Sequence, residues 1–280
     1  AEHRQVDLPG ADGHCGASCR PDTAGILAAA ASGELGALVI GGVDVSDLPD
    51  PAAARAAVEA APFVVSLELR AGEITDRADV VFPVAPVAEK SGTFLDWEGR
   101  ERPFEAALRD TGAMPDLRIL SALAEAMDID LGLPDTQTAR AELARLAEWG
   151  GAPAPAPDTR PAAPPKPVLG EAILAGWRML LDRGRLQDGE PYLAGTARAP
   201  VVRLSAASAD EIGARDGEPV TVATDRGEIT LPLVIGDLPD RVVWLPLASP
   251  GSLVHEQLAA VPGDIVSIRA AVSGRQEAPQ

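Results

Sequence analysis

Aromatic residues are scarce in this sequence, at 3% of 280 residues. A hydrophobic core must therefore be built mainly from alanine, valine, leucine and isoleucine, although the apolar content of 46% is ordinary for a soluble globular protein. A chain of this length can form one large core or two smaller ones, and two domains are the more common solution.

Cysteine is almost as rare. Two cysteines cannot form a disulfide framework for a chain of this size, which fits a reducing compartment such as the cytoplasm. They form the cluster His14-Cys15-x-x-x-Cys19. A zinc or iron–sulfur site would need a fourth ligand, and the two other histidines, His3 and His255, are remote in the sequence. We expect a loop with two free thiols and no metal site.

Long hydrophobic runs and excess positive charge are missing as well. No run of 18 apolar residues occurs, so no transmembrane helix and no direct membrane insertion are expected. The 24 basic residues are outnumbered by 42 acidic ones, and a net charge of −18 repels nucleic acid and anionic lipid. The chain opens at Ala1 in loop-like sequence without a signal peptide, and we interpret it as a fragment whose N-terminal part precedes Ala1.

The first half has the pattern of an α/β domain, which we place at residues 1–149. Short apolar runs that end in glycine or charge predict parallel strands, and alanine-rich segments with capping residues predict helices between them. Strand, helix and strand in succession indicate a parallel sheet. The predicted strands are 37–44, 63–69 and 78–84, and the predicted helices are 21–33, 50–61, 72–78 (short), 115–131 and 136–150.

A proline-rich linker follows at residues 150–167, where the apolar periodicity disappears. Residues 168–280 predict one helix, 170–184, and then a small β-barrel. In the predicted hairpin turn "TDRGE" we place Gly227 at the position that needs a positive φ. The predicted strands of the barrel are 200–205, 219–236, 241–248 and 264–270.

Few residues have the pattern of a catalytic or binding site. Gly41 and Gly42 end a strand and could cradle a phosphate, but no phosphate-binding glycine motif is present and a tight turn is the simpler interpretation. Glu89 and Lys90 follow another strand, where α/β proteins build sites, although a surface ion pair there would be ordinary. His255 reads as a surface or loop histidine. We predict no catalytic residue, since no nucleophile–base set can be assembled.

Two stretches carry a family resemblance. "ADVVFPVAPVAEKSGTFLDWEGR" resembles the signature of the molybdopterin oxidoreductase superfamily, and "LSAASADEIGARDGEPVTVATDRGEITLPLVIGDLPDRVVWLP" resembles that family's last domain, a double-psi β-barrel. "ALVIGGVD" takes the place of the preceding family strand, with Asp44 instead of asparagine and no proline after it. The first match consists of the strand Ala78–Pro83, Glu89, Gly92-Thr93 and Glu98-Gly99-Arg100.

Within the superfamily the chain is most similar to the large iron–sulfur subunits of the proton-pumping NADH–quinone oxidoreductases, respiratory complex I. The spacing between the domains is short, no cysteine or selenocysteine stands in place of a molybdenum ligand, and "EKSGTFLDWEGRERPFEAAL" has the Glu-Gly-Arg form. The resemblance implies iron–sulfur clusters in the missing N-terminal part and no cofactor in these residues. It also implies a structural role against other subunits of the peripheral arm, on the cytoplasmic face of the inner membrane.

The resemblance further implies a vestigial pterin pocket. We expect this pocket to bind no cofactor, because Trp97 and Asp96 would clash with an anionic pyrophosphate. We expect residues 78–108 to serve folding and docking, with Val80, Val81 and Phe82 buried in the sheet. The alternatives are a fragment of a catalytic enzyme of the formate dehydrogenase or nitrate reductase type, or a free-standing nucleotide-binding module. The candidate residues of the vestigial pocket are Gly41, Gly42, Glu89, Gly92, Thr93 and His255.

Overall fold

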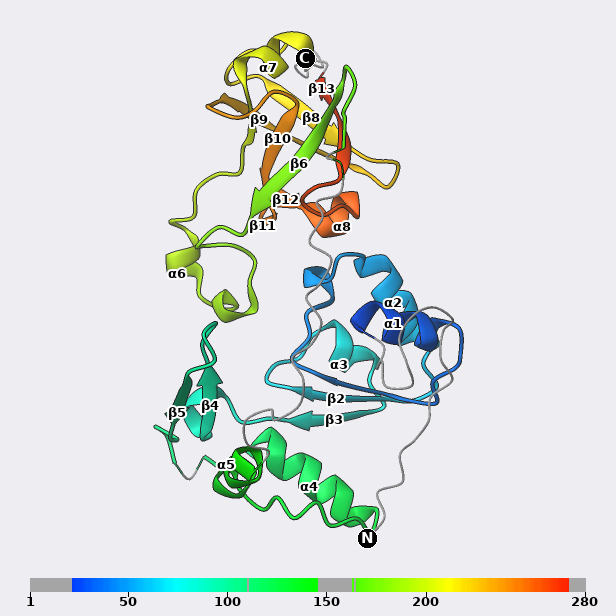
Figure 1. Ribbon diagram of the computed structural model, residues 1–280, viewed down its shortest axis with the longest axis vertical. Coiled ribbons are helices and arrows are strands. Elements are labelled where there is room, and N and C mark those ends of the chain that lie inside the picture. The colour runs from blue at the N-terminus through cyan, green and yellow to red at the C-terminus, as the bar shows by residue number, and fades with distance from the viewer. Residues whose placement is uncertain (1–21, 110, 146–162, 164, 272–280) are drawn as a thin grey trace, which may run out of the picture.

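The computed structural model describes residues 22–109, 111–145, 163 and 165–271. Figure 1 shows an α/β half, which carries strands β1 to β3, and a barrel half, which carries strands β6 to β10 and β13. The predicted cluster of His14, Cys15 and Cys19 lies outside the described residues, and so does most of the predicted linker 150–167.

A parallel three-stranded sheet forms the centre of the α/β half. Its strands are β1 (Leu38–Gly41), β2 (Val64–Glu68) and β3 (Val80–Pro83), in the order β1-β2-β3. All three were predicted, because a strand that is covered on both faces has a nearly continuous apolar sequence. The register pairs Val39 with Val65 and Leu67 with Phe82.

Three helices cover one face of this sheet. They are α1 (Thr23–Ala31), α2 (Pro51–Ala60) and the short α3 (Glu73–Arg77), with the 3-10 turn η1 (Val45–Asp47) after β1. Asp22 and Asp50 begin α1 and α2 by accepting hydrogen bonds from the backbone of the first turn. The core between helices and sheet is made of small side chains, as the low aromatic content predicts: Ala30, Leu38, Val45, Ala54, Ala57, Val58, Ala61, Val64 and Ile74.

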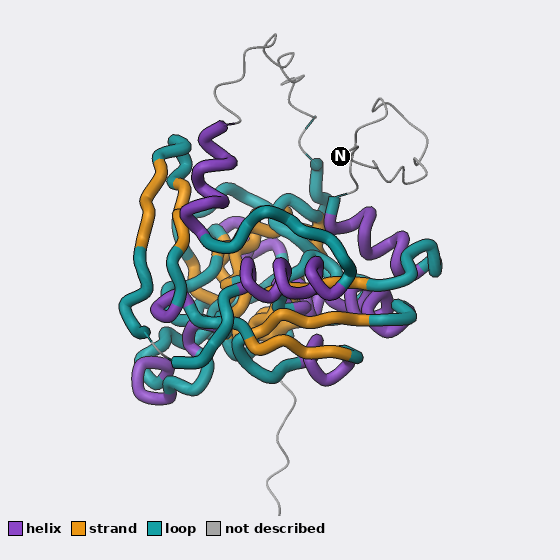
Figure 2. Tube along the Cα trace, turned by 90° about the horizontal axis from the view of Figure 1, so that it is seen from below, coloured by secondary structure: helices purple, strands orange, loops and turns teal. Residues whose placement is uncertain are grey.

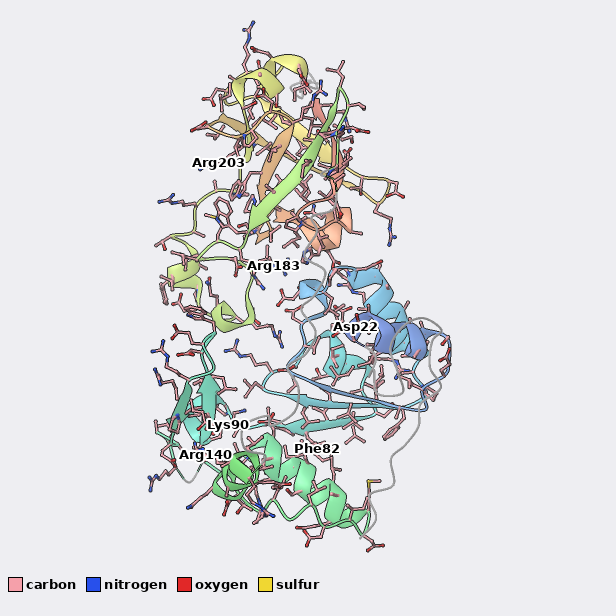
Figure 3. All side chains as sticks on the ribbon, viewed as in Figure 1. Asp22, Phe82, Lys90, Arg140, Arg183 and Arg203 are labelled. Atoms are coloured by element: carbon pink, nitrogen blue, oxygen red, sulfur yellow. The ribbon has the colours of Figure 1, made fainter. Side chains whose placement is uncertain are left out.

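The opposite face carries α4 (Asp116–Ala126), which packs through Ile119 and Leu123 against Val65, Leu67 and Phe82. Figure 3 shows Phe82 between β3 and α4. The expectation that Val80, Val81 and Phe82 are buried is wrong for Val81, which is 41% exposed, and Val80 and Phe82 are only partly buried. Side chains alternate along a strand, so Val81 points to the other face, where β3 is the edge strand and no helix covers it fully.

A β-hairpin that the sequence analysis did not predict follows β3. The chain passes through the 3-10 turn η2 (Val87–Glu89) into β4 (Gly92–Leu95) and returns as β5 (Glu101–Phe104). Its turn is held by Asp96, whose carboxylate accepts hydrogen bonds from the backbone N–H of Glu98 and Arg100. Helix α5 (Thr136–Arg145) lies beside this hairpin and donates to it through Arg140.

The second half is a closed six-stranded barrel with the strand order β10-β6-β13-β8-β9-β7. Two pairs, β6–β10 and β7–β9, are parallel, and the other pairs are antiparallel. This confirms the predicted fold class, a parallel-sheet α/β domain followed by a double-psi β-barrel. The strands are β6 (Glu171–Trp177), β7 (Val202–Leu204), β8 (Pro219–Ala223), β9 (Glu228–Ile235), β10 (Val242–Pro246) and β13 (Ile265–Ala270).

The predicted helix at 170–184 is wrong, because β6 occupies its first half. Ala172 and Leu174 point into the barrel core while their neighbours point outward, and this alternation is that of a strand. The second half of the predicted helix is loop that leads into the 3-10 turn η3 (Arg185–Gln187). The remaining elements are α6 (Pro191–Ala194), α7 (Ala206–Glu211), β11 (Ala248–Ser249), β12 (Ser252–Leu253) and α8 (Val254–Leu258).

The turn between β8 and β9 corrects a second prediction. Gly227 does not have a positive φ. Glycine is needed here because the turn approaches α8 closely, and a Cβ at this position would collide with the backbone carbonyl of Gln257. The turn is also tied to α8 by the Thr224 hydroxyl, which donates to the carbonyl of Leu258 over 2.7 Å.

The barrel has a core of its own. Its buried residues come only from residues 172–268, and none belongs to the two cores of the α/β half. The division into residues 1–149, 150–167 and 168–280 stays a prediction, since the boundaries fall in and around residues outside the described part.

Candidate functional site: the cleft between the two halves

A cleft of about 820 Å³ separates the α/β half from the barrel. The α/β half contributes the segment after β1, Arg55 of α2 and Glu73 of α3. The barrel half contributes the loop after β6 and the start of α8, including His255. Figure 3 shows Arg183, which also lines the cleft, between the two halves.

The cleft lies at the carboxyl end of β1, where α/β sheets place their ligands. Gly41 and Gly42 lead the chain out of β1 into it, and Gly42 has a φ of +64°. Asp44 then caps η1 by accepting hydrogen bonds from the amide and the hydroxyl of Ser46. The two glycines are therefore turn residues at the edge of the cleft, and the residues that line it follow them.

The lining of the cleft is strongly acidic. Seven carboxylates line it, against three arginines and His255. Every one of these carboxylates already accepts a hydrogen bond or forms an ion pair within the protein. The acidic residues are Asp44, Asp47, Glu73, Asp182, Asp188, Glu190 and Glu256, and the arginines are Arg55, Arg183 and Arg185.

Arg55 bridges the two halves across the cleft. Its guanidinium pairs with Glu73 in the α/β half and donates to Glu256 of α8 over 2.8 Å. Hydrogen bonding to Glu73, and then to Glu256, raises the pKa of Arg55 above its ordinary value. The Arg55 guanidinium therefore stays protonated and positively charged over the whole pH range in which proteins are folded.

Three further arginines connect the halves. Arg178 in the barrel half donates to Asp47 over 2.9 Å, and its bond to Asp182 is the main cause that raises its pKa. Arg70 in the α/β half donates to the carbonyl oxygens of Arg185 and Asp188. Arg226 in the barrel lies 3.8 Å from Asp50. The contact between the halves thus depends largely on arginine.

Arg55→Ala is expected to loosen this contact, because Glu73 and Glu256 would then face each other without a cation between them. An exposed ion pair contributes on the order of 0.2–1 kcal/mol and weakens as salt shortens the screening length. We expect the radius of gyration from X-ray scattering to be larger in Arg55→Ala than in the wild type at about 0.1 M salt. The wild type should approach the same value only at about 1 M salt, where the Debye length is about 3 Å.

Arg269→Ala is the matched control, since Arg269 forms an exposed ion pair with Glu228 and both residues belong to the barrel half. It removes the same charge without touching the cleft and should leave the radius of gyration unchanged. Equal radii in wild type and Arg55→Ala at low salt would show that other contacts hold the halves together.

The predicted pocket residues fall into two groups. His255 lines the cleft, whereas Glu89, Gly92 and Thr93 lie at or just before the base of the β4–β5 hairpin. There Arg140 donates to the Thr93 hydroxyl over 2.8 Å and also to the carbonyl oxygen of Gly92. These residues position the hairpin and do not line the cleft.

Lys90 does not pair with Glu89. Its ammonium donates to Asp116, the first residue of α4, over 2.6 Å, and Figure 3 shows Lys90 near Arg140 at the hairpin. Gly92 lies close against Phe104, since a Cβ there would be 2.6 Å from the ring and the ring would have to shift. Phe104 in turn stacks on Phe94, with ring centroids 4.8 Å apart. The Gly-Thr of the signature is thus explained by the hairpin.

Trp97 was predicted to obstruct the vestigial pocket, and this stays a prediction, since the residue does not line the cleft. It is 93% exposed at the hairpin turn. Asp96 beside it is engaged in the turn. The carboxylates that do line the cleft come from the loop after β1, from α3 and from the barrel half, which sequence reasoning did not connect.

The bridging arginines were missed for a simple reason. Arg55 and its partner Glu256 are 201 positions apart, and Arg178 and Asp47 are 131 positions apart. No local pattern relates residues at such separations. Among the described residues, no group of three or more histidine, cysteine, aspartate or glutamate side chains could hold a metal ion. No helix in the described part of the chain is long and apolar enough to cross a membrane.

Comparison with known proteins supplies the family. The family model described as "Molybdopterin oxidoreductase" matches residues 17–126, and that described as "Molydopterin dinucleotide binding domain" matches residues 187–270. Acetylene hydratase from Pelobacter acetylenicus has a similar fold, with a TM-score of 0.55 at 16% identity, over 86% of this chain and 42% of that one.

Two relatives are much more similar in sequence. The G subunit of the NADH-quinone oxidoreductase of Mycobacterium tuberculosis is 57% identical over 268 residues, which cover 95% of this chain and 32% of the relative. The protein of the same name from Streptomyces coelicolor is 54% identical over 252 residues, which cover 88% of this chain and 30% of the relative. The chain thus spans about a third of the length of these relatives. It belongs to the family of NADH-quinone oxidoreductase G subunits and carries that family's molybdopterin oxidoreductase-like domains.

Proposed function

We propose that these residues form the C-terminal structural and assembly region of the large iron–sulfur subunit of a proton-pumping NADH–quinone oxidoreductase, without an active site of their own. The observation that supports this is the state of the cleft. It lies where a dinucleotide would bind in an α/β fold, yet seven carboxylates line it and each already has a partner within the protein.

A bound pyrophosphate needs free backbone N–H groups or cations directed at it. Two of the three arginines that line the cleft are committed, Arg55 to Glu73 and Glu256 and Arg185 to Asp188, whereas Arg183 forms no ion pair with another described residue. An entering anion would have to compete with these carboxylates and would be repelled by them. The cleft is therefore better suited to joining two halves of a protein than to holding a pterin dinucleotide.

The partners we propose are the other subunits of the peripheral arm of the complex, at the cytoplasmic face of the inner membrane. Iron–sulfur clusters are proposed for the part of the subunit outside these residues. The β4–β5 hairpin supports a docking role, because Phe94, Leu95 and Trp97 are largely exposed on it. Exposed aromatic side chains of this kind are frequent anchors in protein interfaces.

Metal and nucleotide analysis tests the proposal. Neither molybdenum nor a guanine dinucleotide should be released from the purified chain, and the complex that contains it should carry iron without molybdenum. In a thermal-shift screen, a nucleotide at 100 times its Kd would add about 2.7 kcal/mol to the free energy of unfolding. Stoichiometric molybdenum would instead favour a fragment of a catalytic molybdopterin oxidoreductase, and a nucleotide-dependent shift would favour a binding module.

Glu89→Gln tests the absence of chemistry at the signature glutamate. Glu89 ends η2, next to Lys90, and does not line the cleft. We expect NADH–quinone turnover per assembled complex to stay within a factor of about two, since the change removes one charge outside any proposed reaction. Normal assembly with a hundredfold lower turnover would assign Glu89 a chemical role and overturn the proposal. Lys90→Met, which removes the pair with Asp116, is the matched control for a change that is only structural.

A further inference from the structure

Strands β6, β10 and β7 are neighbours in the barrel, and their outward side chains share one surface. Val243 and Leu245 of β10 point into the barrel core, so Trp244 between them points outward. The register places Trp244 between Ala175 of β6 and Arg203 of β7. A large aromatic residue therefore occupies the centre of an outer face, where an isolated barrel would normally carry polar side chains.

Two neighbouring side chains pack on Trp244, which is only 4% exposed. The ring of Trp177, at the end of β6, lies against it with ring centroids 4.9 Å apart and planes tilted by 55°. The guanidinium of Arg203 lies 5.4 Å from the ring centroid of Trp244, which is a cation–π contact. Figure 3 shows Arg203 at the outer surface of the barrel half. We call Trp177, Trp244 and Arg203 the tryptophan face.

Each member of the tryptophan face leaves one interaction unused. Trp177 is 61% exposed, although aromatic residues are scarce in this chain. Arg203 forms no ion pair with another described residue, and the ladder places the apolar Trp244 and Val234 on either side of it. The indole N–H of Trp244 is buried and has no hydrogen-bond partner in the described part of the chain. A buried donor without an acceptor is destabilising, so a partner can complete this surface.

Arg203 sets the charge of that partner. Carboxylates are abundant in this chain, with 42 acidic against 24 basic residues, yet none of the described ones pairs with Arg203. A carboxylate supplied from outside would therefore meet a cation that is free to pair with it. The net charge of −18 repels nucleic acid and anionic lipid, so the anion that fits is a carboxylate on a protein. Tryptophan and arginine are also the side chains that most often anchor protein interfaces.

The tryptophan face differs from the β4–β5 hairpin, where Trp97 is exposed. Figure 2 shows the two strands of this hairpin at the left edge, apart from the other strands. Trp97 is 93% exposed and belongs to neither aromatic pair of the described residues, so no ring holds its side chain in place. Trp177 is held against Trp244 before any partner binds. An anchor that is already ordered loses less conformational entropy on binding, which favours the tryptophan face as a docking site.

We infer that a carboxylate-bearing segment of another subunit of the complex docks on the tryptophan face. Its carboxylate accepts hydrogen bonds from the guanidinium of Arg203, and an apolar side chain next to that carboxylate covers the ring of Trp177. This inference rests on the proposed assembly role and names one surface for it. The two fail separately. Molybdenum in the complex would overturn the proposed role, whereas a complex with iron alone whose tryptophan face touches no other subunit would overturn only this inference.

Photo-crosslinking in the assembled complex tests the contact directly. The photoreactive p-benzoylphenylalanine replaces Trp177, and mass spectrometry identifies the peptide to which it crosslinks. We expect that peptide to come from another subunit and to contain an aspartate or a glutamate. The control places the same photoreactive residue at Arg215, which is exposed in the turn between α7 and β8, and it should not crosslink to that peptide. An intact complex with no crosslink from position 177, or with one only to the same polypeptide, would overturn the inference.

Charge reversal tests the chemistry of the contact. We expect Arg203→Glu to make the subunit dissociate from the purified complex about tenfold faster, measured by size-exclusion chromatography over time, because like charges then face each other. Arg215→Glu makes the same charge change elsewhere on the barrel and should leave the rate unchanged. Replacing the crosslinked carboxylate with lysine should restore the wild-type rate in Arg203→Glu, which a merely destabilised barrel would not allow. Equal rates for the two arginine variants, or faster dissociation that the lysine does not reverse, would contradict the inference.

Discussion

Gly227→Ala is expected to destabilise the barrel by about 3 kcal/mol, the upper part of the range for overpacking a well-packed site. The added Cβ would collide with the backbone carbonyl of Gln257, and a backbone atom cannot swing aside as a side-chain end can. The same contact region includes the bond from the Thr224 hydroxyl to the carbonyl of Leu258, so a shift of α8 would weaken that bond too. Urea unfolding monitored by tryptophan fluorescence gives the free energy, since Trp244 lies in β10.

Gly236→Ala is the matched control at the other end of β9. Gly236 has nothing within 4 Å of where its Cβ would be and does not have a positive φ. Alanine there should be neutral or stabilise by up to about 1 kcal/mol, because it restricts the unfolded chain. Equal stability of the two variants would show that the turn at Gly227 can move away from α8 without cost.

Leu245→Ala is expected to lower the free energy of unfolding of the barrel by about 2–5 kcal/mol. Leu245 in β10 is fully buried among the barrel residues, and truncation leaves a cavity that rigid strands on both sides cannot close. Because the barrel and the α/β half have separate cores and a polar contact, we expect only the barrel transition to shift. Differential scanning calorimetry, with hydrogen exchange of β2 and β9 as local reporters, resolves the two.

Leu67→Ala is the mirror-image variant in the α/β half, where Leu67 packs under α4 and is 5% exposed. It should shift the α/β transition by about 2–5 kcal/mol and leave the barrel transition in place. If each variant moved both transitions equally, the two halves would unfold as one cooperative unit. The predicted linker at residues 150–167 would then not separate two independently unfolding domains.

The parallel sheet was predictable because its signals are local. "LVIG", "VVSLE" and "VVFP" are short apolar runs, and the aspartates before α1 and α2 mark where those helices begin. The burial of individual residues was less predictable. Val81 has the sequence of a core residue, but its exposure depends on whether a helix covers that side of the edge strand, which no local pattern states.

Strand β6 shows how local propensity misleads. "EAILAGW" is rich in helix-forming residues, and a window that continues to Met179 and Leu181 suggests a helix. The barrel overrides this preference, since β6 is needed between β10 and β13 to close the sheet. One signal was present: a Cβ on Gly176 would lie 2.5 Å from the carbonyl oxygen of Leu245, and glycine inside a strand often marks such close approach.

The candidate site was less predictable than the fold. The signature around Glu89 drew attention to residues 78–108, yet there it encodes a hairpin with Arg140 at its base. A five-residue connection with glycine between short runs, residues 96–100, was available as a hairpin signal, but the alternating charges after Gly99 concealed the second strand. The cleft depends on ion pairs between distant segments, and such pairs become visible only when both halves have been placed.

The strand order of the barrel also has a consequence during synthesis. β6 is the first barrel strand to leave the ribosome, but its two neighbours are β10 and β13, and β13 begins 88 residues after β6 ends. At about 5–20 residues per second, β6 waits on the order of 4–18 seconds for its last partner. The sheet of the α/β half pairs consecutive strands and can fold in that interval. The barrel is a domain of high contact order that closes late, so a ribosome that stalls before Ile265 leaves an apolar strand unpaired and prone to aggregation.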